Sequence, residues 1–155
     1  MRRLFLIPVL LFFSLLLHSQ QISEGQDGKF YGENNKPYSG IYKEYWENGD
    51  LRMEMSLKKG AMNGQVIIYF SNQKKNEIRS YKSGKMHGKW YTWDESGKLI
   101  AEANYRNSQK DGKWYVWDEN GTKRYDMTYK SGEKTGVWYM WDEKGNLIME
   151  KDYGK

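Results

Sequence analysis

The sequence predicts an all-β fold, an elongated single-layer antiparallel meander of five stacked β-hairpin repeats. Two regularities predict it. Glycine recurs at a strict 24-residue interval, at Gly40, Gly64, Gly88, Gly112 and Gly136. Two rows of tryptophan keep the same interval, namely Trp90, Trp114 and Trp138, then Trp93, Trp117 and Trp141. A fixed period of about 20–50 residues indicates one supersecondary unit stacked on copies of itself. Function is therefore expected on an extended surface and not in a deep pocket.

One unit shows how the layer is built. Along residues 88–93 alternate side chains point to opposite faces of a strand. Trp90 therefore lies on one face, while Tyr91 and Trp93 share the other. Large rings on both faces can shield the backbone of a single layer, which suits a chain with 16% aromatic residues.

Turn residues separate the strands of each unit. Residues 94–97 end in a glycine that can take a positive φ, and residues 98–105 return as the second strand. A polar link, residues 82–88, makes a second reversal into the next unit. Two units depart from this pattern, because Gln73 replaces the turn glycine and Ser108 replaces the linker glycine. Each repeat is thus expected to add about 10 Å, two strand spacings, to the sheet.

The N-terminal residues predict export. A short basic segment precedes an apolar run of fourteen residues from Leu4 to Leu17. A membrane-spanning helix needs roughly 20 such residues, so a cleaved signal peptide is favoured over a signal anchor. The expected division is a signal peptide at residues 1–19, a linker at 20–35 and a repeat domain at 36–155. The protein is then secreted, or periplasmic at the cell envelope.

The charge of the mature chain argues against nucleic acid as a partner. Removing residues 1–19 deletes two of the 25 Lys/Arg and none of the 20 Asp/Glu, so the formal charge falls from +5 to +3. Acids and bases alternate through every repeat and form no basic block, which a nucleic-acid-binding surface requires. The chain has no cysteine, so its stability must come from packing and backbone pairing.

The residues around each link resemble a known family. The run 84–90, Gly-Lys-Met-His-Gly-Lys-Trp, and the Trp-Asp-Glu-x-Gly turn that follows are similar to the MORN repeat, in its bacterial variant of about this length. The similarity covers residues 36–153. It implies a sheet of stacked hairpins and a role in protein scaffolding, dimerisation or phospholipid contact. For the bacterial variant it also implies an antitoxin role. Export does not suit a cytoplasmic antitoxin.

No catalytic, cofactor-binding or metal-binding residues are expected, and the chain is predicted not to be an enzyme. After the predicted signal peptide at residues 1–19 is removed, His87 is the one histidine of the mature chain. The acidic pairs that begin at Asp94, Asp118 and Asp142 are the best carboxylate candidates for glycosidase chemistry or for Ca²⁺. Equivalent acids are expected to lie about 10 Å apart along the sheet, too far apart for one cation or one scissile bond. A role in the turns explains them better.

The candidate binding site is a row of rings on one face. Its members are Tyr91, Trp93, Tyr115, Trp117, Tyr139 and Trp141. The opposite row, which contains Trp114, is interpreted as core in which tryptophans of successive repeats pack on one another. The candidate row either packs in the same way or binds a partner, because Tyr and Trp combine an apolar body with a polar tip. A protein partner is favoured, and a glycan or a membrane surface are alternatives. The rival hypothesis is an antitoxin or immunity-like protein that neutralises a toxin.

Overall fold

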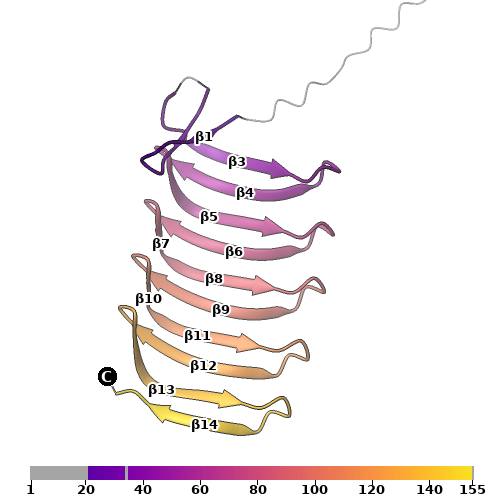
Figure 1. Cartoon of the computed structure of the whole chain (residues 1–155), viewed down its shortest axis with the longest axis vertical. Helices are drawn as coiled ribbons and strands as arrows, with labels where there is room; N and C mark the ends of the chain where they lie inside the picture. The colour runs from indigo at the N-terminus through magenta and orange to yellow at the C-terminus, as the bar shows by residue number, and fades with distance from the viewer. Residues whose placement is uncertain (1–20, 34, 155) are drawn as a thin grey trace, which may run out of the picture.

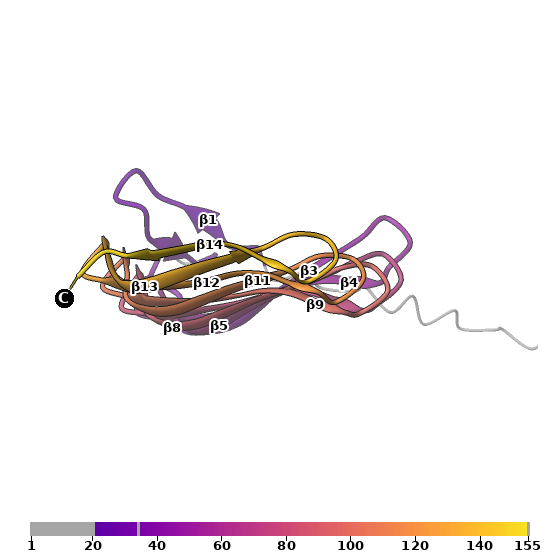
Figure 2. The same cartoon turned by 90° about the horizontal axis from the view of Figure 1, so that it is seen from below.

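The computed structural model describes residues 21–33 and 35–154. The predicted signal peptide, residues 1–19, lies outside the described residues. All regular structure in the described part of the chain is β-strand. Figure 1 shows the strands stacked one after another along the long axis, and Figure 2 shows them as one layer with β1 to one side. The predicted all-β, single-layer meander is confirmed.

The strands follow one another in chain order. They are β1 (Ser23–Glu24), β2 (Phe30–Tyr31), β3 (Gly40–Tyr45), β4 (Leu51–Lys58), β5 (Ala61–Tyr69), β6 (Lys75–Lys82), β7 (Lys85–Met86), β8 (Gly88–Trp93), β9 (Leu99–Arg106), β10 (Gln109–Lys110), β11 (Gly112–Trp117), β12 (Lys123–Lys130), β13 (Glu133–Trp141) and β14 (Leu147–Asp152). The large sheet runs from β14 to β3 without a crossover, and the short strands β7 and β10 pair beside this path with β6 and β9. Five hairpins, β3–β4, β5–β6, β8–β9, β11–β12 and β13–β14, are therefore the five repeats.

The turn inside each hairpin has one residue in the left-handed region. Gly97 has a φ of 92°, and its N–H donates to the Asp94 carbonyl at 2.9 Å. Gly121 occupies the same place with a φ of 82°. Gln73, which replaces the turn glycine, still has a φ of 65°. The backbone of the turn is therefore set by the repeat, and the second repeat carries an unfavourable residue in it.

Gly121→Val is expected to lower the free energy of unfolding by roughly 1–3 kcal/mol, because a β-branched residue is strained at positive φ. No atom lies within 4 Å of a Cβ built at this position, so the cost comes from backbone conformation alone. Chemical denaturation measures it. Gly121→Asn is the matched control and should cost much less, since Asn tolerates this region. Equal costs for valine and asparagine would contradict the assignment.

Gln73→Gly should raise the free energy of unfolding by about 0.5–1 kcal/mol, because it relieves a left-handed non-glycine residue. The gain is limited by the greater freedom that glycine has in the unfolded chain. Gln73→Ala keeps the strained backbone and should bring no gain. Thermal unfolding of the two variants beside the wild type tests this, and a destabilised glycine variant would show that the Gln73 side chain contributes more than the strain removes.

The links between hairpins are two-residue turns. Ser83 and Gly84 have φ values of 49° and 79°, and both residues of the other links also have positive φ. Positive φ at both central residues defines the type I′ turn, whose twist matches that of the flanking strands. The Gly84 N–H also donates at 2.8 Å to the carbonyl of Met62, which lies near the start of β5, just after the preceding link. Each of the last three links is therefore hydrogen-bonded to the strand that follows the preceding link, along one side of the sheet.

The glycine that marks the 24-residue period lies at an irregularity in the strand pairing. Gly88 has a φ of 90°, and regular pairing between β6 and the next repeat is interrupted around it. The Ser80 carbonyl there accepts two hydrogen bonds, from the His87 N–H at 2.9 Å and from Trp90 Nε1 at 3.1 Å. The glycine thus lets the strand bend so that an indole N–H reaches the neighbouring backbone.

The segment expected to be a linker, residues 20–35, has strands in its described part. β1 and β2 pair with each other through Ser23 and Tyr31. Ile22 and Phe30 pack against the buried apolar cluster, and the Phe30 N–H donates to the Gly60 carbonyl at 2.8 Å. The cluster consists of Met55, Leu57 and Val66, each about 5% exposed. The segment therefore belongs to the fold and covers the N-terminal end of the stack.

Candidate binding surface

One face of the sheet carries a continuous line of rings, which we call the ladder face. Neighbouring ring centroids in this line are 4.6–5.6 Å apart. In order, the rings are Tyr81, Trp90, Tyr105, Trp114, Tyr129, Trp138 and Tyr153. The prediction that this tryptophan row packs is thus correct, but the contacts differ from the expected ones. A tyrosine from the returning strand lies between successive tryptophans, because Trp90 and Tyr105 project from paired strands of one hairpin.

Each tryptophan of the ladder is also fixed by a hydrogen bond. Trp114 Nε1 donates to the Asn104 carbonyl at 3.0 Å, and Trp138 Nε1 to the Thr128 carbonyl at 2.9 Å. Lysines cover the rings of the last repeats, with Lys110 Nζ 4.3 Å from the Trp114 ring centroid. The rings of the ladder face therefore pack against one another and the backbone.

The six candidate residues lie on the other face as three pairs, which we call the paired face. The ring centroids are 5.6 Å apart for Tyr91–Trp93, 5.7 Å for Tyr115–Trp117 and 5.8 Å for Tyr139–Trp141. The last pair is stacked, with an interplanar angle of 26°. All six side chains are half-buried, so part of every ring remains in contact with solvent. The structure thus brings the six residues together two by two, once in each of the last three repeats.

Acidic side chains separate the tyrosines of the paired face. In the strand register Glu102 lies opposite both Tyr91 and Tyr115, and Asp126 lies opposite both Tyr115 and Tyr139. Directly opposite residues point to the same face of the sheet. From strand to strand across the sheet, the side chains on this face therefore alternate between a tyrosine phenol and a carboxylate.

Lysines neutralise those carboxylates. Lys89 Nζ is 2.7 Å from Glu102 Oε1, and Lys113 Nζ is 2.8 Å from Asp126 Oδ1. The hydrogen bond that Lys89 donates to Glu102, with a smaller contribution from its hydrogen bond with Tyr91, raises the pKa of Lys89 above its usual value. Lys123 Nζ lies 4.9 Å from the Tyr115 ring centroid. The paired face thus offers apolar rings among ion pairs that nearly cancel in charge.

The acids and lysines of this face were not among the predicted site residues. Their signal is the same 24-residue period, because Glu102 repeats as Asp126, and Lys89 as Lys113. Placing them beside the rings also requires the register between hairpins, which the period alone does not give.

The acids at the hairpin turns have a structural role. Asp94 Oδ1 accepts the Lys98 N–H at 2.9 Å, and Asp142 Oδ1 accepts the Asn146 N–H at 2.8 Å. Hydrogen bonds from Ser96 to Asp94, and from Asn146 to Asp142, hold the pKa of both carboxyls below the usual value. These carboxylates close the turns, as the sequence predicted. Among the described residues no group of three or more His, Cys, Asp or Glu could hold a metal ion.

Residues 21–33 and 35–154 contain no helix long and apolar enough to cross a membrane.

The MORN repeat variant family matches this chain at residues 38–59, 86–107 and 110–131. Each match spans one hairpin and ends in the link that follows it. The structure folds the chain between and after the matched segments into the same unit. Comparison with curated proteins gives no match.

Proposed function

We propose that this chain, which contains MORN-variant repeats as its link and turn motifs predicted, is an exported, non-enzymatic binding protein at the cell envelope. MORN repeats typically serve as binding or scaffold repeats. The single observation that supports the choice of surface is the set of three half-buried Tyr–Trp pairs on the paired face. Most rings of both faces are half-buried. The ladder rings, however, contact one another in one continuous line along the sheet, whereas the paired-face rings contact each other only within each pair.

We favour a protein as the partner. Aromatic side chains are enriched at the centre of protein interfaces, and charged groups are tolerated there when they are paired. The paired face has both features, with Trp117 and Tyr115 beside the ion pair of Lys113 and Asp126. The ion pairs of Lys89 with Glu102 and of Lys113 with Asp126 cancel charge on this surface, which argues against a strongly charged partner such as a nucleic acid.

The test immobilises the purified protein and presents three separate probes, a protein extract of the host envelope, the insoluble envelope polysaccharide, and vesicles of envelope lipid. A protein partner predicts retention from the extract alone. The double variant Tyr115→Ser with Tyr139→Ser should lose that retention. Retention of the polysaccharide or the vesicles, without a protein, would assign the surface to a glycan or a membrane. A tight one-to-one complex with a toxic protein would favour the immunity-like role.

Export is tested on its own. If residues 1–19 form a signal peptide, the intact mass of the protein recovered from its host corresponds to a chain that begins near Gln20. Recovery of a membrane-bound chain that retains Met1 would contradict the envelope location.

A further inference from the structure

The two edges of the sheet expose apolar side chains. Five large hydrophobic residues are well exposed in the described part of the chain, and four of them lie on the edge strands. On β3 these are Ile41 at 55% and Tyr45 at 53%, and on β14 Leu147 at 50% and Ile148 at 55%. Soluble proteins usually protect sheet edges with charges, bulges or a covering segment, because an open edge pairs with other strands. We propose that copies of this chain join head to tail, with β14 of one copy pairing with β3 of the next.

The register between repeats predicts how the edges would meet. At one equivalent position of each internal junction, a residue lies opposite the one 13 positions later, as in Glu102 with Tyr115 and Asp126 with Tyr139. Extending this rule by one repeat places Glu150 of one copy opposite Lys43 of the next. Opposite charges on directly facing residues stabilise strand pairing. The two edges are thus complementary in charge in the register that the repeats already use.

The exposed apolar residues are complementary in the same register. At the last internal junction Arg124 Nε donates to the Trp141 carbonyl at 2.8 Å, and Lys123 Nζ lies 5.9 Å from the Trp141 ring. One repeat later, Leu147 and Ile148 occupy the positions equivalent to Lys123 and Arg124. In the first repeat, Tyr45 occupies the position equivalent to Trp141. The junction between copies would therefore bring the exposed side chains of β14 onto the exposed ring of β3.

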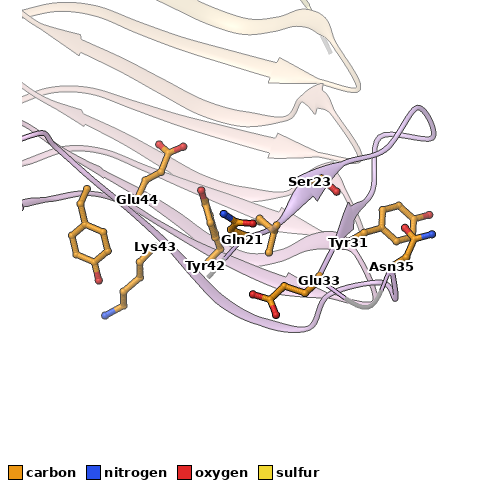
Figure 3. A pocket seen from close by; sticks show the side chains of 11 residues that line it. Gln21, Ser23, Tyr31, Glu33, Asn35, Tyr42, Lys43 and Glu44 are labelled. Carbon is orange, nitrogen blue, oxygen red and sulfur yellow. The ribbon is translucent and has the colours of Figure 1, made fainter. Parts of the chain in front are cut away.

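A groove beside β3 leaves room for the added strand. It has a volume of 630 Å³ and separates Tyr42, Lys43 and Glu44 of β3 from the N-terminal segment (Figure 3). Glu33 lies on its far wall, so carboxylates on both walls can receive Lys151 of the incoming strand. Just before β3 begins, the Tyr38 N–H already donates to the Phe30 carbonyl at 2.9 Å, so this part of the edge is occupied by the N-terminal segment. Pairing is thus limited to the half of β3 nearer the hairpin turn.

Two different edges meet in this contact, so it does not close on itself. A head-to-tail contact without closure builds an open series of oligomers. The weight-average mass of the purified wild-type protein, measured by sedimentation, should therefore rise with concentration beyond two chain masses. Glu150→Lys and Lys43→Glu each place like charges at the junction, so each variant alone should stay at one chain mass at concentrations where the wild type associates.

Mixing the two variants restores opposite charges at every junction and should restore association. Glu95→Lys, the same charge change at an exposed turn of the middle hairpin β8–β9, is the control and should associate as the wild type does. Circular dichroism confirms that the variants fold, which matters for Lys43 because it pairs with Glu54 at 3.1 Å. A wild type that stays at one chain mass at every concentration would overturn the proposal. So would association that Glu150→Lys abolishes and Lys43→Glu leaves intact, because that would mean pairing of β14 with β14.

Discussion

Trp114→Ala is expected to remove about 3–5 kcal/mol from the free energy of unfolding, the usual cost of truncating a packed tryptophan. Trp114 is the middle tryptophan of the ladder, with centroid distances of 5.2 Å to Tyr105 and 5.5 Å to Tyr129. The truncation breaks both ring contacts and removes the indole N–H that donates to the Asn104 carbonyl. It also removes the ring that Lys110 covers. Because a domain has about 5–15 kcal/mol in total, this variant should fold poorly.

Chemical denaturation followed by circular dichroism measures that loss. Trp114→Phe separates ring packing from the hydrogen bond, because it keeps an aromatic side chain and removes the donor. It should cost less than half as much as the alanine variant. If phenylalanine costs as much as alanine, the indole hydrogen bond and not the ring ladder dominates at this position.

Leu57→Ala should cost about 2–5 kcal/mol, the range for truncating a buried leucine. Leu57 is 5% exposed and packs with Met55 and Val66 beneath Phe30 of the N-terminal segment. Its loss leaves a cavity where the N-terminal segment meets the first repeats. Leu147→Ala makes the same change at a residue that is 50% exposed and should stay within about 0.5 kcal/mol of wild type in dilute solution. Similar losses at the two positions would mean that the apolar cluster does not anchor the N-terminal segment.

Much of the fold could be predicted because it is periodic. Glycine, turn and ring positions that recur every 24 residues fix the hairpin as the unit and its stacking as the architecture. The alternation of side chains also placed Tyr91 with Trp93 on one face, and the ring distance of 5.6 Å agrees with it. The meander required nothing beyond these local patterns.

The contacts between strands were harder to predict, because they depend on register. Irregular pairing between Thr92 and Trp93 shifts one strand against the other within the hairpin, and the residues around Gly88 interrupt pairing between hairpins. These shifts decide that Tyr105 reaches Trp90 and separates it from the next tryptophan. The sequence contains the residues of the ladder but not the offset that interleaves them.

The N-terminal segment was harder still, because it stands outside the period. Ile22 and Phe30 are isolated apolar residues in a polar stretch, which is typical of a linker. They pack because the first two repeats carry Tyr42 and Val66 where later repeats have tryptophan. The smaller ring and the valine leave apolar surface that the segment covers, and this complementarity is visible only once the repeats are stacked.

The central claim is that the two faces have different roles, and two matched double variants test it directly. Tyr115→Ser with Tyr139→Ser changes the paired face, and Tyr105→Ser with Tyr129→Ser makes the same chemical change on the ladder face. For each, the free energy of unfolding and retention of the envelope protein extract are measured. We expect the ladder variant to be strongly destabilised, and the paired-face variant to stay folded but no longer retain its partner. A paired-face variant that folds and still retains the partner as the wild type does would contradict the claim.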